Sequence, residues 1–162
     1  MILGRLGALW RRGAAEAPAS APAPGGFFPP EYKSFPFSAG DLLVSESSAG
    51  LFSVNRILAV DRIVYAPGGV IDIQGQAFTV PVADWLLVVS ASFGRDEFPT
   101  FEAARSAALA GRWRVHMAHC ANRAPGAMLG QVLVGTKPVT EAELEGYRLW
   151  RAAFDKGEAG IY

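Results

Sequence analysis

The stretch from Gly40 to Phe93 reads almost wholly as β-strand, and it limits the chain to folds built around an antiparallel sheet. It is rich in Val, Ile, Leu and Phe, and turn residues interrupt it at short intervals. Ala66-Pro67-Gly68-Gly69 has Pro and Gly at the two central positions that a type II turn requires. Val70–Ile73 and Ala77–Val80 flank Gln74-Gly75-Gln76, which predicts a hairpin.

The remaining strands of this block differ in length and character. Asp41–Glu46 predicts a first strand, and turn residues follow at 47–50. Leu51–Tyr65 is too long and too mixed for one flat strand, so we expect a bulge or sharp bend near Asn55-Arg56. Trp85–Val89 is continuously apolar, as in a strand that is buried on both faces.

Beyond residue 93 the pattern changes to a helix, two strands and a final helix. Thr100 can cap the first helix and Gly111 can end it. Thr140-Glu141-Ala142-Glu143 is a capping box that starts the final helix, which Gly157 ends. We expect these elements at Phe101–Ala110, Trp113–His119, Leu129–Val134 and 140–156, with a loop at 122–128.

Together these segments predict one α+β domain over residues 39–162. A strongly bent antiparallel sheet, or a small and partly closed β-barrel, should precede the helix–strand–strand–helix segment. Gly40-Asp41, the apolar strand, the short turn and the long bent strand resemble the first hairpin of SH3-like barrels. This resemblance covers about 25 residues, and it implies a barrel-like fold without implying an activity.

The N-terminal part has a different composition from the domain. Spacing predicts a short amphipathic helix for residues 1–12, from Ile2, Leu3, Leu6, Leu9 and Trp10. This segment is either a frayed terminus or a segment that docks on the domain, a partner or a membrane surface. Residues 13–38 form an Ala/Pro-rich linker followed by an aromatic arm. The arm holds four Phe and one Tyr within 27–37, so we expect it to pack on the domain.

Composition excludes several classes of function. The 15 basic and 15 acidic residues balance, and the basic ones are scattered, which argues against nucleic-acid binding. Cys120 is the only cysteine, so neither an intrachain disulfide nor a cysteine-rich zinc site can form. A lone thiol is typical of a reducing compartment, which predicts a cytoplasmic protein. No apolar run reaches the roughly 18 residues that a membrane span needs.

The one dense group of reactive side chains lies between His116 and Arg123, and it includes both histidines and Cys120. In a strand, His116 and Cys120 share a face but lie about 13 Å apart, so they cannot bond each other or hold one metal. His119 and Cys120 point to opposite faces. We therefore assign no catalytic residue, no metal site and no cofactor.

The residues Asn122 and Arg123 form a better candidate site, because they fall in the expected loop beside the Pro125-Gly126 turn. A guanidinium makes bidentate contacts with carboxylate or phosphate, so a small anionic ligand fits Arg123. His119, Asn122 and Arg123 are the predicted binding residues. The competing interpretation is an ordinary turn in which Asn122 bonds its own backbone.

These observations favour a non-catalytic binding or protein-interaction module, with a protein or a small anionic ligand as partner. Two alternatives stay open at this point. One is a small enzyme that uses His119, Cys120, Asn122 and Arg123. The other is a tethered membrane-surface or assembly protein that uses the segment 1–12.

Overall fold

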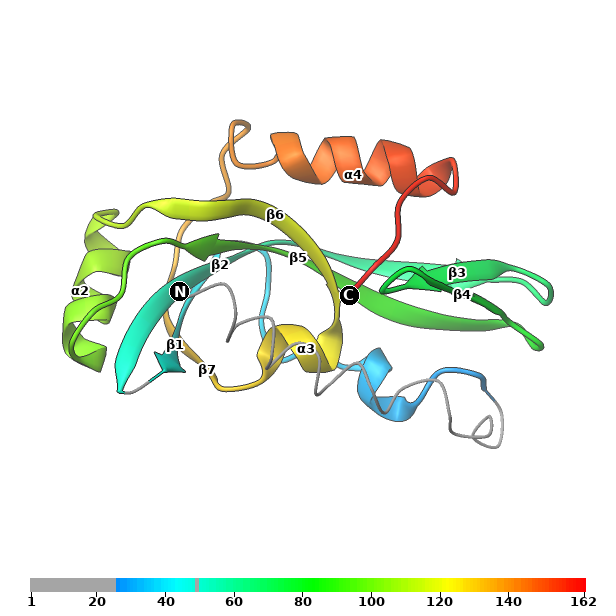
Figure 1. Ribbon diagram of the computed structural model, residues 1–162, viewed down its shortest axis with the longest axis horizontal. Coiled ribbons are helices and arrows are strands. Elements are labelled where there is room, and N and C mark those ends of the chain that lie inside the picture. The colour runs from blue at the N-terminus through cyan, green and yellow to red at the C-terminus, as the bar shows by residue number, and fades with distance from the viewer. Residues whose placement is uncertain (1–25, 49) are drawn as a thin grey trace.

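The computed structural model describes residues 26–48 and 50–162 (Figure 1). The predicted helix at 1–12 and the linker up to residue 25 lie outside the described residues. This described part of the chain has an α+β fold, with a five-stranded antiparallel sheet, a separate hairpin and three α-helices. The elements are η1 (Pro30–Lys33), β1 (Asp41–Ser48), β2 (Leu51–Tyr65), β3 (Val70–Ile73), β4 (Gln76–Thr79), β5 (Asp84–Gly94), α2 (Phe101–Ala110), β6 (Val115–Arg123), α3 (Ala124–Met128), β7 (Gln131–Thr136) and α4 (Glu145–Asp155).

The sheet has the strand order β6-β5-β2-β1-β7, and every neighbouring pair is antiparallel. It is neither closed nor strongly curled, so both expected forms of the sheet, the strongly bent sheet and the small partly closed barrel, were wrong. Closing a barrel would require the first and last strands to pair, whereas β6 and β7 lie at opposite edges of this sheet. The hairpin β3–β4, which would have to continue an SH3-like barrel, forms a separate two-stranded sheet, and β3 also makes a parallel bridge from Ile73 to Ile161.

The predicted irregularity in the long strand β2 is present, but it lies slightly later than expected. The register with β5 shifts between Ile57 and Ala59, so Leu58 is the additional residue. Because of this bulge, Arg56 and Asp61 lie on the same face of the sheet, although five positions separate them.

The helices after residue 93 follow their predicted capping signals. Thr100 Oγ1 accepts a hydrogen bond from the Ala103 amide at 3.1 Å, and Gly111 ends α2 with a φ of 66°. The capping box also forms, since the Thr140 amide donates to Glu143 Oε2 at 2.8 Å. The helix α4 itself starts two residues after the box, at Glu145.

The loop expected at 122–128 was wrong. The strand β6 continues to Arg123, and the short helix α3 follows it directly. Pro125 lies in the first turn of α3, where its missing amide hydrogen costs nothing.

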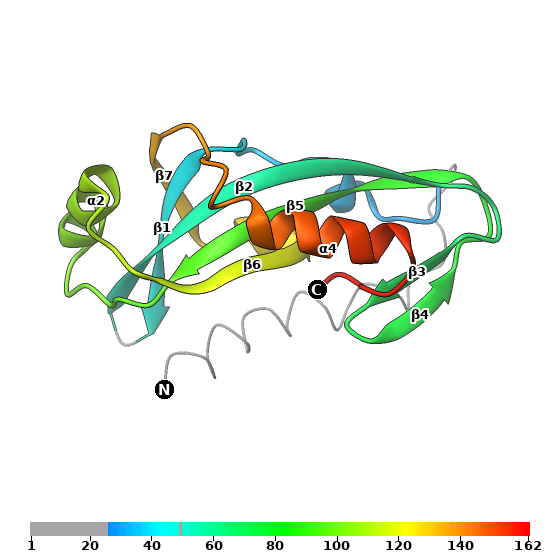
Figure 2. The same ribbon diagram turned by 90° about the horizontal axis from the view of Figure 1, so that it is seen from above.

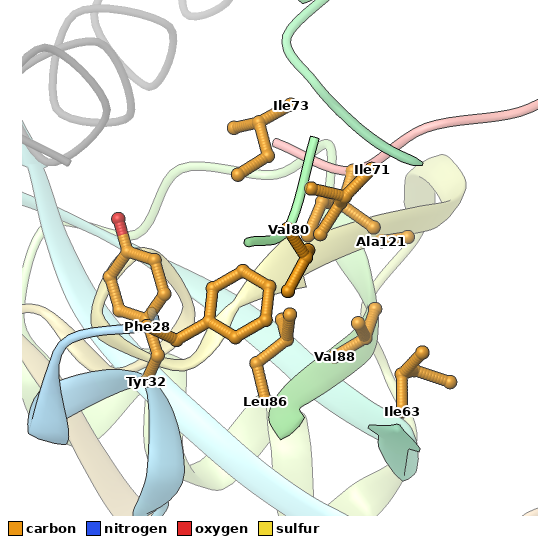
Figure 3. Packing of buried hydrophobic residues seen from close by; sticks show 10 residues of the cluster. Phe28, Tyr32, Ile63, Ile71, Ile73, Val80, Leu86, Val88 and Ala121 are labelled. Atoms are coloured by element: carbon orange, nitrogen blue, oxygen red, sulfur yellow. The ribbon is translucent and has the colours of Figure 1, made fainter. Parts of the chain in front are cut away.

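The aromatic arm packs into the main apolar core, as its composition predicts. Phe28 and Tyr32 are buried beside Val80 and Leu86 (Figure 3). Asp84 holds the arm in place, since its carboxylate accepts from the Phe28 amide at 2.7 Å and pairs with Lys33 Nζ at 2.7 Å. The full cluster is Phe28, Tyr32, Ile63, Ile71, Ile73, Val80, Leu86, Val88, Ala121 and Ile161.

Helices cover the sheet on both sides, but they do so unequally. The short helix α3 packs Ala124 and Ala127 against an apolar face of Leu43, Ile57 and Val89. The helix α4 lies over the other side, along β5 and β6 (Figures 1 and 2), and none of its own residues is fully buried. The helix α2 packs Ala104 and Ala108 near one end of the sheet. No helix in the described part of the chain is long and apolar enough to cross a bilayer.

Candidate functional site

The predicted site residues all lie in the second half of β6 rather than in a loop. Register with β5 pairs Cys120 with Ala91 and Asn122 with Val89. Since side chains alternate along a strand, His119 and Arg123 point to one face and Asn122 points to the other. The structure therefore does not bring His119, Asn122 and Arg123 together around one point.

Arg123 is only 4% exposed, and two of its three guanidinium nitrogens have hydrogen-bond partners within the chain. Its Nε donates to the main-chain oxygen of Tyr162 at 3.2 Å, and its Nη1 donates to the hydroxyl of Tyr32. The guanidinium also lies 5.4 Å from the centroid of the Tyr32 ring. These contacts join η1 to the last residue of the chain. A role for Arg123 in binding an anion stays a prediction.

Cys120 and Asn122 point toward the apolar side of the sheet. Burial raises the pKa of the Cys120 thiol to about 11, so very little nucleophilic thiolate exists at neutral pH. The thiol donates weakly to Asn122 Oδ1 at 3.7 Å, and Asn122 Nδ2 donates to the Cys120 carbonyl at 3.2 Å. Both of these hydrogen bonds join residues of the same strand, β6.

His119 lies beneath α4 and contacts both the sheet and the helix. Its Nε2 is 2.9 Å from Ser90 Oγ, and its ring centroid lies 5.6 Å from that of Trp150 and 6.3 Å from that of Tyr147. Burial lowers the pKa of His119 to about 4, so the imidazole is neutral at physiological pH. Gly146 permits this close approach, because a Cβ at that position would lie 2.8 Å from His119 Cβ.

Polar side chains continue along β2 under the same helix. Arg56 Nε lies 2.5 Å from Glu143 Oε1, and the Tyr147 hydroxyl donates to Asp61 Oδ1 at 3.0 Å. We call Arg56, Asp61, Ser90 and His119 the polar strip. Three buried polar atoms in this region have no hydrogen-bond partner: Asp61 Oδ2, Tyr65 Oη and Arg151 Nη1. Two polar contacts, Arg56 with Glu143 and Asp61 with Tyr147, thus hold α4 and the segment before it on the sheet. Trp150 and Phe154 of the same helix also pack against the apolar core.

The Ser90–His119 pair has the residue types of an activated nucleophile, but its setting does not support catalysis. Ser90 is 0% exposed, so its hydroxyl cannot meet a substrate without movement of α4. The nearby carboxylate of Asp61 bonds Tyr147 rather than orienting the imidazole. No group of three or more His, Cys, Asp or Glu side chains in the described chain is placed to hold a metal ion.

The edge strand β7 is a different kind of candidate, which sequence reasoning did not single out. Val132 and Leu133 are 49% and 50% exposed, and they point to opposite faces because they are neighbours in a strand. Met128 and Leu129, just before the strand, are also exposed. We call Met128, Leu129, Val132 and Leu133 the β7 patch. Among the described residues, no strand pairs with the outer edge of β7.

Side-chain hydrogen bonds fix β7 at both of its ends. Asn55 Nδ2 donates to Gln131 Oε1 at 2.9 Å and to Ser45 Oγ at 3.0 Å, which joins β7, β2 and β1. At the other end, Thr136 Oγ1 donates to Asp41 Oδ1 at 2.8 Å. The strand is therefore held in a fixed register on β1, and its outer edge is presented without a need for reordering.

The sequence carried a weak signal for this surface. Gln131–Thr136 contains no charged residue and no proline, whereas natural edge strands are usually protected by Lys, Pro or inward charges. The missing charges and proline indicate an unprotected edge only if the strand is known to lie at the edge of a sheet. The position of β7 at the edge depends on its pairing with β1, which is distant in the sequence.

Comparison with known proteins adds no assignment. No protein family, no curated protein and no solved structure matches this chain.

Proposed function

We propose that this domain is a non-catalytic interaction module and that its contact surface is the outer edge of β7. An extended segment of a partner protein would add to the sheet next to β7, a mode in which main-chain hydrogen bonds give affinity and alternate side chains give specificity. The observation that carries the proposal is the half-exposure of Val132 and Leu133 on both faces of an uncharged edge strand.

The chemistry of the patch indicates what kind of segment it would accept. The register with β1 shifts at Val134, so Gln131, Val132 and Leu133 form the regular part of the edge. A partner strand would bury Val132 on one face and Leu133 on the other, at roughly 25 cal/mol for each Å² of apolar area removed from water. The matching segment is extended and uncharged, with apolar side chains on both faces.

A peptide-display screen tests this proposal. Randomised segments of strand length are selected on the full chain, and the selected peptides are titrated against a Val132→Lys/Leu133→Lys variant. The control is Val64→Lys/Leu149→Lys, which changes the same two residue types at exposed positions away from β7. We expect a loss of affinity of at least about tenfold in the β7 variant alone, because a buried unpaired charge costs several kcal/mol. Equal loss in both variants, or selection of no peptide, would contradict the proposal.

A small anionic ligand at Arg123 stays a separate prediction. The predicted role of residues 1–12 at a membrane surface concerns residues that the structure does not describe.

A further inference from the structure

We infer that α4 and the segments on either side of it form a strap that detaches from the sheet while the sheet stays folded. We call residues 139–160 the α4 strap. Figure 1 shows α4 joined to the rest of the chain by one connecting segment at each end. The inference concerns the face of the sheet under α4, so it does not depend on the β7 patch.

Both ends of the α4 strap are fixed to the rest of the domain. Just before it, the Lys137 amide donates to the Gly40 carbonyl at 3.0 Å. Just after it, the Ile161 amide donates to the Asp72 carbonyl at 2.9 Å, and Ile161 is buried. The strap can therefore open between two anchors that stay in place.

The three α-helices of the described chain are not packed equally firmly. The helix α2 buries Ala104, Ala107 and Ala108, and α3 buries Ala124 and Ala127. In contrast, α4 has no fully buried residue. Local opening occurs where few apolar contacts are buried, so α4 is the helix that should leave the sheet first.

Polar groups under the strap lower the cost of opening. Asp61 Oδ2, Tyr65 Oη and Arg151 Nη1 are buried without a hydrogen-bond partner, and water can reach all three once the strap opens. The Trp150 Nε1 donates to the Gly160 carbonyl at 2.9 Å, and both residues belong to the strap. Opening therefore does not have to break this hydrogen bond.

His119 makes the opening sensitive to pH. The closed strap buries the imidazole, and this burial lowers the pKa of His119 to about 4. In the open form the imidazole meets water and titrates near its ordinary value of 6.5. Between these two values the open form binds more protons than the closed form, so acid favours opening.

Other groups of the same face surround His119, and they come from each element packed there. Burial raises the pKa of Glu143, but hydrogen bonds from Thr140 and Arg56 outweigh it and hold the pKa below its ordinary value of 4.5. Glu143 therefore loses its charge mainly below the range in which His119 acts. The charged or titratable groups are Arg56 and Asp61 of β2, Arg123 of β6, Tyr147 and Arg151 of α4, and Glu143.

Amide hydrogen exchange of the full chain, corrected for intrinsic rates, tests the inference. A lifted helix of 11 residues is marginal in water, so its amides exchange once the strap opens. We expect α4 amides to share one opening constant that is larger than that of β5 amides. Between about pH 7.5 and about pH 5 it should rise at least about tenfold. His119→Gln should remove this rise, and the exposed His116→Gln should keep it.

Gly146 gives a second test that does not depend on pH. A Cβ at this position would lie 2.8 Å from His119 Cβ. Alanine is a better helix former than glycine, so the substitution would strengthen a helix that had no contact with the sheet. Gly146→Ala should instead raise the opening constant of α4 at least about fivefold, because overpacking pushes the strap away from β6. The β5 amides should stay more protected than those of α4.

Several results would overturn the inference. If α4 and β5 amides share one opening constant, α4 leaves the sheet only when the whole domain unfolds. Exchange that is graded from one end of α4 would show fraying instead of a detaching strap, and stronger protection of α4 in Gly146→Ala would also contradict it. A rise at acid pH that persists in His119→Gln would overturn the role of His119.

Discussion

Arg56 in β2 and Glu143 in the capping box before α4 form an ion pair with 2.5 Å between Nε and Oε1. Arg56 is buried, and it also donates to the carbonyls of Gly40, Lys137 and Pro138. One guanidinium thus joins the start of β1, the end of β7 and the entry to α4. Arg56 and Glu143 lie 87 positions apart in the chain, so this contact couples the helix to the sheet that carries the β7 patch.

Replacing Glu143 by Gln is expected to lower the free energy of unfolding by about 2 kcal/mol. The substitution leaves the buried guanidinium without its counter-charge, although part of the cost is screened because Glu143 is 32% exposed. Denaturant unfolding measures the change. Glu141→Gln is the control, since Glu141 pairs only with Arg148 at the surface. Equal effects of the two substitutions would show that the Arg56 contact does not hold α4.

The free energy of unfolding should fall with decreasing pH across the range in which His119 becomes protonated. Its pKa is lowered by burial to about 4, whereas it titrates near its ordinary value of 6.5 when unfolded. Between these values the unfolded chain binds more protons than the folded chain, so stability is fully present above pH 6.5 and is lost as pH falls toward 4. Urea midpoints across this range should fall less in His119→Gln than in wild type. The exposed His116→Gln serves as the control.

Replacing Arg123 by Lys is expected to lower stability by roughly 2 kcal/mol, because an ammonium cannot reproduce the fork between Tyr32 and Tyr162. Thermal unfolding measures this effect, with the exposed Arg112→Lys as the matched control. The ligand hypothesis makes the opposite prediction. An unchanged melting temperature, together with weaker binding of inorganic phosphate, would support Arg123 as an anion-binding residue.

Two truncations should behave differently. Removal of residues 1–24 should leave the melting temperature unchanged, because the Ala/Pro-rich composition offers few apolar contacts. Removal of residues 1–38 also takes away Phe28 and Tyr32, which are buried, and loss of one such side chain costs about 3–5 kcal/mol. Calorimetry compares the two chains. A large drop with the shorter truncation, or none with the longer one, would contradict the expected domain boundaries.

Cys120 should alkylate slowly at neutral pH. Its pKa is raised by burial to about 11, so the reactive thiolate is scarce until strongly alkaline pH. The rate of reaction with iodoacetamide, followed by mass spectrometry from pH 7 to 9, should rise with each step and stay well below that of a free thiol. Rapid reaction with a plateau near pH 7 would indicate an activated cysteine and would revive the enzyme hypothesis.

Local chemistry was enough to predict several elements of this fold. The Thr100 cap and the Gly111 stop define α2 within the chain segment itself, and the Thr140–Glu143 box forms as its spacing predicts. Alternation and turn residues likewise predicted the strands and the hairpin at β3–β4. These signals depend on residues that are three or four positions apart, so a single sequence contains them.

Long-range pairing decided the rest. No local pattern shows that β6 and β7, which are adjacent in the chain, lie at opposite edges of the sheet. The same holds for Arg123, whose partners Tyr32 and Tyr162 are 91 and 39 positions away. Exposure of Val132 and Leu133 follows from that topology, because the same six uncharged residues would be buried in a central strand. The sequence by itself determined most of the strands and helices, but not the end of β6 or the short helix α3. Only the tertiary structure decided which strands lie at the edges of the sheet.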